Sequence, residues 1–130
     1  IDFAKRFGYT TLSDSAGLSL VLGGSEVSLL EHTNAYATLA NNGSYHQPVS
    51  ILRVIDNKGS VLSEWKEAPG EEAVKPELAA TISSVLSDDG ARAYMFGRNG
   101  SLTLPDRPAA AKTGTTNDYK DAWTMGYVHL

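Results

Sequence analysis

Residues 109–128, AAAKTGTTNDYKDAWTMGYV, carry the strongest structural signal in this sequence. Two runs of strand-forming residues, 109–116 and 122–128, lie on either side of a short polar link, and this order is typical of a β-hairpin. In the second run, large apolar residues occupy alternate positions: Trp123, Met125 and Tyr127. Because successive side chains of a strand point to opposite faces, this alternation predicts the core-facing side of a sheet strand.

A second hairpin is predicted earlier in the chain. The run 49–55 is rich in β-branched residues and the run 61–65 is also strand-like. Residues 56–59, Asp-Asn-Lys-Gly, form a turn signal with glycine at its end. The charged residues 66–74, which contain Pro and Gly, indicate a linker after this hairpin.

Two amphipathic helices are predicted beside these strands. The first runs from about residue 26 to residue 41, and Ser25 can cap its first N–H groups. Its predicted contact stripe consists of Leu29, Thr33, Tyr36 and Ala40. The second begins at Pro76, because a missing N–H costs nothing in a first turn, and is expected to end at Gly90. Its helical period is carried by Leu78, Ile82, Val85 and Leu86.

The remaining segments complete the expected architecture. Residues 1–7 indicate the end of a helix. Residues 8–24 and 90–107 contain several glycine breakers, so we expect the first segment to be mostly loop and the second to be irregular. The sequence therefore predicts an α+β fold. In it, helices pack on one or both sides of a partial antiparallel sheet that ends in the hairpin of residues 109–128.

Composition indicates a globular chain the size of one domain. Of the 130 residues, 42% are hydrophobic and 20% are charged, and the net charge is −4. This mildly acidic balance argues against nucleic acid as a partner, because nucleic-acid binding needs a basic face. The absence of cysteine excludes a disulfide scaffold, a thiol nucleophile and a Cys-ligated zinc site. No apolar run approaches the ~18 residues of a membrane span.

The tripeptide Lys112-Thr113-Gly114 carries the chemical signal. A Lys-Thr-Gly strand is one of three signatures of serine enzymes that act on penicillin-like and D-alanyl substrates. The lysine supplies a fixed positive charge, and the hydroxyls of Thr113 and Thr115 can bind a substrate carboxylate. Gly114 has no Cβ, so a substrate backbone can lie against the strand. The N–H that follows the glycine can point at a developing oxyanion.

The residues around this tripeptide closely resemble the corresponding segment of penicillin-binding proteins, above all the bifunctional class A type. Three further segments carry the resemblance: LGGSEV at 22–27, AYATLANNGSY at 35–45 and VIDNKGSVL at 54–62. The resemblance covers most of the chain from about residue 16 onward. It implies the penicillin-binding-protein transpeptidase fold, which is β-lactamase-like. We expect residues 1–130 to form part of a transpeptidase domain that is truncated at both ends.

The resemblance also implies a function and a set of site residues. Class A proteins join a peptidoglycan glycosyltransferase to a D,D-transpeptidase, so the expected parent cross-links stem peptides and is acylated by β-lactams. Such an enzyme acts at the extracytoplasmic face of the bacterial cell membrane and needs no cofactor. The resemblance makes Lys112 catalytic and makes Thr113, Gly114 and Thr115 substrate-binding, with the amide of Thr115 in the oxyanion hole. Strict alternation puts Lys112 and Thr113 on opposite strand faces, so the lysine would have to reach around.

The sequence departs from the family pattern at the nucleophile. In the family, the serine lies in a Ser-x-x-Lys motif and a Ser-x-Asn motif shuttles protons, both upstream of the Lys-Thr-Gly strand. No Ser-x-Asn occurs in this chain. The one Ser-x-x-Lys, Ser63 to Lys66, falls in a predicted strand, where the two side chains would not share a helical face. We therefore expect the chain to lack the nucleophile.

Two other functional classes stay open. One is a hydrolytic relative, a D,D-carboxypeptidase or a serine β-lactamase, and the other is a non-catalytic binding module that keeps the strand. The three histidines, His32, His46 and His129, have no ligand spacing, so no metal site is predicted, and His32 is expected at the edge of the core. A partial sheet leaves strand edges unpaired, so we expect the fragment to form a homodimer.

Overall fold

A computed structural model describes residues 1–128, so His129 lies outside the described residues. The helices, in chain order, are α1 (Asp2–Lys5), η1 (Asp14–Leu22), α2 (Leu29–Ala40), α3 (Pro76–Ser87), α4 (Asp89–Phe96) and η2 (Asn117–Tyr119), where η marks a 3₁₀ helix. The strands are β1 (Ser44–Tyr45), β2 (Arg53–Ile55), β3 (Val61–Glu64), β4 (Glu71–Glu72), β5 (Ala110–Thr115) and β6 (Ala122–Tyr127). Within the described residues they form three two-stranded antiparallel sheets, β1–β4, β2–β3 and β5–β6. The predicted mixture of helices and antiparallel hairpins is confirmed.

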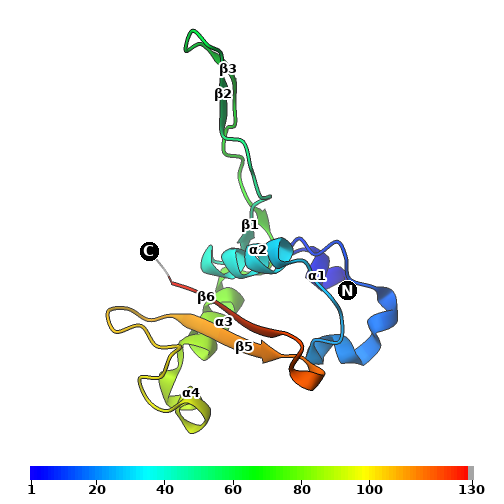
Figure 1. Ribbon diagram of the computed structural model, residues 1–130, viewed down its shortest axis with the longest axis vertical. Helices are drawn as coiled ribbons and strands as arrows, with labels where there is room; N and C mark the ends of the chain where they lie inside the picture. Colours follow the sequence, from blue (N-terminus) through cyan, green and yellow to red (C-terminus); the bar gives the residue numbers. More distant parts are fainter. Residues whose placement is uncertain (129–130) are drawn as a thin grey trace.

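The β5–β6 hairpin is the sheet that lies within the body of the molecule, with α2 and α3 beside it (Figure 1). Its register is continuous from Ala110 opposite Tyr127 to Thr115 opposite Ala122. The predicted core-facing residues of β6 are half-buried, whereas the residues between them are exposed. Trp123 lies edge-on to His32 of α2, with ring centroids 5.6 Å apart. The sequence pattern therefore identified the covered face correctly.

Helix α2 differs in detail from its prediction. It begins at Leu29 rather than near residue 26, because the side chain of Ser28, not that of Ser25, accepts the N–H of Glu31. The predicted stripe is also wrong, since Leu29 is 63% exposed and the buried positions are Ala35 and Thr38. The reason is that α2 has neighbours on several sides, so no single stripe marks its contacts.

The second helical region is two helices rather than one. Pro76 lies in the first turn of α3 as predicted, but α3 ends at Ser87 and not at Gly90. The side chain of Asp88 then accepts the N–H of Ala91 and starts α4, which includes Gly90. This short helix corrects the expectation that residues 90–107 are wholly irregular, because a local cap is enough to start a helix.

The N-terminal region also contains more helix than expected. The sequence predicts that residues 8–24 are mostly loop, whereas residues 14–22 form η1, which is interrupted at Gly17 by a non-helical backbone conformation. The predicted helix at the N-terminus is confirmed as α1. Glu31 ties the following loop to α2, because its carboxylate accepts from the hydroxyls of Thr10 at 2.5 Å and Thr11 at 3.0 Å.

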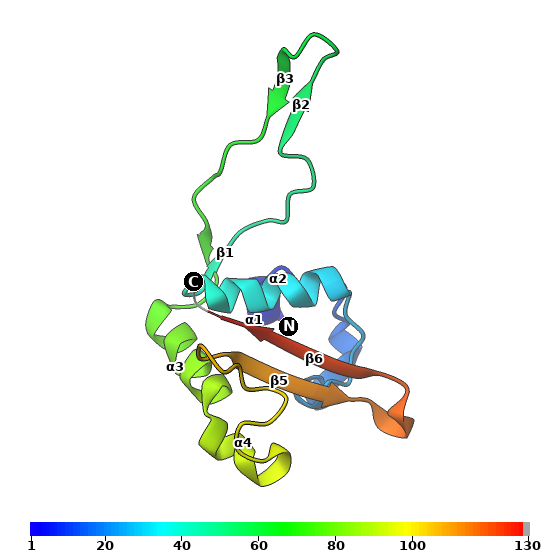
Figure 2. The same cartoon turned by 60° about the vertical axis from the view of Figure 1, so that its left-hand side comes forward.

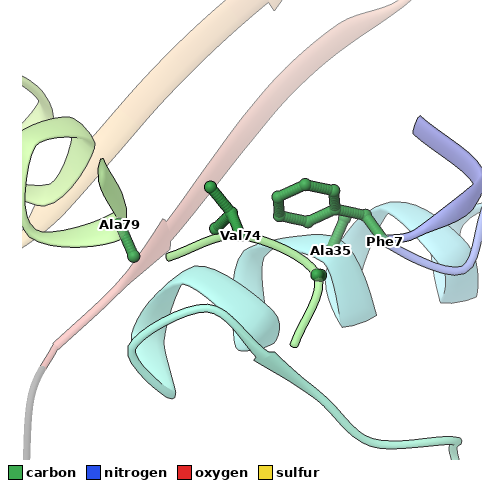
Figure 3. Close-up of a cluster of buried hydrophobic side chains, with 5 residues drawn as sticks. Phe7, Ala35, Val74 and Ala79 are labelled. Carbon is green, nitrogen blue, oxygen red and sulfur yellow. The ribbon is translucent and has the colours of Figure 1, made fainter. Parts of the chain in front are cut away.

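The core of the body is small and lies where α2, α3 and the N-terminal segment meet. Figure 3 shows its side chains and labels Phe7, Ala35, Val74 and Ala79, which come from different segments of the chain. The buried apolar residues of this cluster are Phe7, Ala35, Ala73, Val74 and Ala79. Gly43 (φ 86°) allows close backbone contact, because its carbonyl accepts from the Ala73 N–H at 2.9 Å. A Cβ on Gly43 would lie 2.1 Å from the Val74 carbonyl oxygen.

The β2–β3 hairpin, which we call the arm, projects away from the body in both views (Figures 1 and 2). The hairpin was predicted, and its turn is held by Asp56, whose carboxylate accepts the N–H groups of Lys58 and Ser60 at 2.8 Å. All residues of both strands are exposed. The arm joins the body through β1 and β4, and β4 lies in the segment that was expected to be a linker.

Candidate active site

The Lys-Thr-Gly tripeptide lies in the middle of β5, as the sequence predicted. Residues that are directly opposite in an antiparallel pair share a face. Lys112 is opposite Met125 and Gly114 is opposite Trp123, so both belong to the face that α2 covers. Thr113 is opposite Thr124. The two threonines of the predicted site, Thr113 and Thr115, therefore lie on the other face of the hairpin.

The backbone of β5 has one edge that pairs with β6 and one edge that has no partner strand within residues 1–128. Just beyond the strand, the N–H of Thr116 donates to the carbonyl of Asp121 at 3.0 Å, so Thr116 turns its backbone toward β6. Backbone groups alternate in direction along an antiparallel strand. The N–H and C=O groups of Thr113 and Thr115 therefore point to the free edge, where a ligand can reach them.

Lys112 reaches this free edge although its Cβ lies on the covered face. Its Nζ donates to the carbonyl oxygen of Thr113 at 2.6 Å, and its side chain is exposed. The sequence raised the question of how Lys112 and Thr113 could approach one site from opposite faces. The structure answers it, because the long side chain bends around the strand to the edge.

The hydroxyl and backbone groups at this edge are available for a ligand. Within residues 1–128, no side chain or backbone group makes a hydrogen bond to the hydroxyls of Thr113 or Thr115. A Cβ built on Gly114 would meet nothing within 4 Å, so the space above this residue is open. The free edge thus presents an ammonium group and two N–H groups, and the adjoining face presents two hydroxyls, a combination suited to a carboxylate and an oxyanion.

A group of aromatic side chains holds the hairpin against α2. The hydroxyl of Tyr9 and the Nδ1 of His32 are 2.5 Å apart. His32 in turn lies edge-on to Tyr36 at 5.2 Å and to Trp123 at 5.6 Å between ring centroids. Burial raises the pKa of Tyr9 to about 12 and lowers the pKa of His32, so both groups are neutral near pH 7. The expectation that His32 is a satisfied residue at the core edge is confirmed.

The other candidate groups lie apart from β5. Ser63 is an exposed residue of strand β3 on the arm, so the predicted strand conformation around it is confirmed and it shares no helical face with Lys66. His46 lies near Ser44 at the base of the arm, at 3.4 Å between Oγ and Nε2. Among residues 1–128, no three His, Asp or Glu side chains are grouped so that they could hold a metal ion. In the same range, no helix is both long enough and apolar enough to cross a membrane.

Comparison with known proteins identifies the family. The family described as penicillin binding protein transpeptidase domain matches residues 4–129, and the chain belongs to this family. The penicillin-binding protein 1A of Mycolicibacterium smegmatis is 37% identical over 114 residues, which are 83% of this chain and 14% of that protein. The protein of the same name from Aquifex aeolicus is 37% identical over 127 residues, 98% of this chain and 16% of that protein.

A solved structure gives the same answer for the fold. The penicillin-binding protein PonA1 of Mycobacterium tuberculosis matches with a TM-score of 0.79 and 28% identity, over 96% of this chain and 36% of that one. The chain spans about one seventh of the length of the two penicillin-binding proteins 1A named above. The resemblance to class A penicillin-binding proteins and the expected fold are confirmed.

Sequence reasoning missed two features of this site. It expected the N–H of Thr115 to be available to an oxyanion but did not identify the outward N–H and C=O groups of Thr113, although the polar link at residues 117–121 fixes the register from which they follow. It also did not foresee Thr124, which lies opposite Thr113 and adds a third threonine to the same face. Threonine is common in strands, so its position alone gave no signal.

Proposed function

We propose that this chain supplies the Lys-Thr-Gly side of a serine-type D,D-transpeptidase site that cross-links peptidoglycan stem peptides. The observation that carries the proposal is the free edge of β5, where the Lys112 ammonium lies 2.6 Å from the outward carbonyl of Thr113. Membership of the penicillin-binding transpeptidase family supports it. In this proposal residues 1–130 are part of a transpeptidase domain, and a glycosyltransferase domain belongs to the same enzyme.

Each residue of the edge has a role in the proposal. The hydroxyls of Thr113 and Thr115 bind the terminal carboxylate of the stem peptide, and the outward N–H of Thr115 stabilises the oxyanion. Gly114 leaves room for the substrate backbone, because a Cβ at this position would occupy space that is now open. Lys112 brings positive charge to the serine and to the proton transfers around it.

The reaction itself needs a serine from outside this chain. Its Oγ attacks the carbonyl carbon of the penultimate D-alanine, the C–N bond to the last D-alanine breaks, and that D-alanine leaves as a protonated amine. An amine of a neighbouring stem peptide then attacks the ester, forms the cross-link and releases the serine. β-Lactams stop the cycle at the acyl-enzyme. PonA1 has been solved in complex with penicillin V, and we extend β-lactam binding to this protein.

The proposal assigns the enzyme to the extracytoplasmic face of the bacterial cell membrane, where its substrate lies.

Two alternative functions share the fold but differ in what happens to the bound ligand. In a D,D-carboxypeptidase or a serine β-lactamase, water takes the place of the acceptor amine. In a non-catalytic module, the strand binds its ligand and no ester forms.

We further propose that residues 1–130 in isolation form a homodimer. The two-stranded β5–β6 sheet has no further strand on either edge within the described residues, and open edges invite pairing with another chain. Light scattering over a concentration series tests this, and a monomer at high concentration contradicts it.

Intact-mass spectrometry with a reporter penicillin tests the main proposal. We expect the full-length gene product to gain the mass of one penicillin on a serine, whereas residues 1–130 alone gain nothing. The variant Ser63→Ala is expected to be acylated like the wild type. An adduct on Ser63, or no adduct on the full-length protein, contradicts the proposal. An adduct that forms on a serine and is then removed by water identifies a hydrolytic β-lactamase, and the absence of any adduct is the result that a non-catalytic module predicts.

A further inference from the structure

A pocket lies at the base of the arm, on a different side of α2 from the β5–β6 hairpin. It has a volume of about 350 Å³, within the range of small-molecule sites. One wall consists of Asn34 and other residues of α2, together with Asn41, which follows the end of the helix. The opposite wall is the chain that leaves the arm, with Trp65 and Glu67. Neither wall contains a residue of the Lys-Thr-Gly strand, so the pocket is separate from the site described above.

Hydrogen bonds and close packing fix the segments that line the pocket to their neighbours. The Nδ2 of Asn34 donates to the carbonyl of His46 at 3.0 Å, and the N–H of Trp65 donates to the carbonyl of Leu52 at 2.8 Å. Gly70 packs tightly against the strand that enters the arm, since a Cβ on it would lie 2.0 Å from the Ser44 Oγ. The chain that enters the arm is thus tied both to α2 and to the chain that leaves the arm.

The polar groups of the pocket have spare hydrogen-bonding capacity. No group within residues 1–128 bonds to the side chains of Gln47 or Glu67 or to the indole N–H of Trp65. Asn34 and Asn41 use their NH₂ groups on backbone carbonyls, which leaves their amide oxygens as acceptors. The pocket thus offers both donors and acceptors around one aromatic ring.

We propose that this pocket binds a saccharide. A sugar ring has hydroxyls that donate and accept at once and a C–H face that packs on an aromatic ring, and the amides and Trp65 match these two properties. The carboxylate of Glu67 disfavours an anionic ligand, and no Lys or Arg lines the pocket to compensate it. The volume of about 350 Å³ suits one or two sugar units of a longer saccharide.

The identity of the natural ligand rests on the proposed function. A peptidoglycan transpeptidase works on stem peptides that are attached to a glycan strand of N-acetylated amino sugars. Because the pocket is separate from the β5 edge, it can hold a glycan strand while a stem peptide occupies that edge. This would raise the local concentration of stem peptide at the reacting strand.

Fluorine NMR of the full-length gene product, labelled with 5-fluorotryptophan, detects ligand binding at the side chain of Trp65. The resonances of Trp65 and Trp123 are assigned from the variants Trp65→Phe and Trp123→Phe. We expect chitotriose, a trimer of N-acetylglucosamine, to shift the Trp65 resonance in a saturable way and to leave that of Trp123 unmoved. A Trp65 resonance that stays unmoved, or one that moves with D-alanyl-D-alanine and not with chitotriose, overturns the inference.

Variants of the pocket make the test specific. Asn41→Ala is expected to weaken chitotriose binding at Trp65 about tenfold, as loss of a ligand hydrogen bond does. Asn57→Ala, at the tip of the arm, is the matched control and is expected to bind like the wild type. Equal affinity of all three proteins overturns the inference.

Acylation by penicillin, measured on the same samples, separates this inference from the proposed function. If penicillin acylates the protein normally but chitotriose does not shift the Trp65 resonance, the saccharide site is wrong and the proposed function stands. A saturable Trp65 shift without acylation removes the transpeptidase proposal and keeps the saccharide site.

Discussion

The β5–β6 and β2–β3 hairpins are both antiparallel and both rich in strand-forming residues, yet they have different surroundings. Along β6 every second side chain is half-buried, and β6 lies against α2. Along β2 and β3 every residue is exposed, including Val54 at 41% and Leu62 at 67%. Apolar strand residues therefore predict a strand but not a core. What distinguishes the covered hairpin is strict alternation with large aromatic residues, which the arm lacks.

The first test of this comparison uses two glycines with nearly equal φ. Gly43 in the body has φ 86° and Gly59 in the turn of the arm has φ 85°. Gly59→Ala is expected to cost about 1 kcal/mol of unfolding free energy, because only the left-handed backbone is strained. Gly43→Ala adds a Cβ 2.1 Å from the Val74 carbonyl oxygen, and we expect a loss of about 3 kcal/mol or more.

Urea unfolding followed by circular dichroism measures both variants of the chain. If the two substitutions cost the same, the tight packing between Gly43 and Val74 does not exist in solution.

The second test compares two exposed lysines. Lys112→Ala in the full-length gene product is expected to slow acylation by penicillin about 100-fold, or ~2.7 kcal/mol, which is the scale of one electrostatic stabiliser. Lys58→Ala, in the turn of the arm, is the matched control and leaves the rate unchanged. Stopped-flow acylation kinetics give both rates. A wild-type rate for Lys112→Ala removes this lysine from the site.

The third test compares the apolar side chains of the two hairpins. Trp123→Ala is expected to cost about 2 kcal/mol of unfolding free energy, because the indole is only half-buried against His32. Leu62→Ala on the arm is expected to change it by less than about 0.5 kcal/mol. Thermal unfolding of both variants decides, and a larger loss for Leu62→Ala would mean that the arm packs on another surface in solution.

The smallest expected effect is a pH dependence that differs between body and arm. Burial lowers the pKa of His32 below its ordinary 6.5, so below that pH the unfolded chain takes up a proton that the folded chain does not. Stability should therefore fall as the pH drops from about 7 to about 5, and His32→Gln should flatten this slope.

Asp56 in the arm gives the contrasting case. The N–H groups of Ser60 and Lys58 lower its pKa from 3.8, so its contribution is lost only at more acidic pH. Asp56→Asn should leave the slope between about pH 7 and pH 5 unchanged. Urea midpoints across this range measure both variants, and an unchanged slope in His32→Gln assigns the effect to another group.

Local signals predicted most of the fold. The turn at residues 56–59, Pro76 at the start of α3 and the alternation in β6 each depend on near neighbours, and each prediction is confirmed. The buried face of α2 did not follow from a stripe along the helix, because Ala35 packs in a cluster with Phe7 and Val74, which are distant in sequence.

In the candidate site, too, the features that depend on near neighbours were predicted and those that depend on the folded structure were not. The tripeptide and its strand were predicted from sequence, and the roles of its residues remain predictions. The free edge and the reach of Lys112 to the Thr113 carbonyl depend on register and on side-chain conformation. The pocket at the base of the arm was not foreseen, because Trp65 and Asn41, which both line it, are distant in sequence.

The central claim is that the free edge of β5 receives the substrate. A crystal structure of the full-length gene product acylated by a penicillin tests it most directly. We predict that the penicillin carboxylate lies within hydrogen-bonding distance of the Thr113 and Thr115 hydroxyls, and that the acyl oxygen accepts the N–H of Thr115. An acyl group bound away from this edge, with the Thr115 N–H unoccupied or paired to another strand, would contradict the claim.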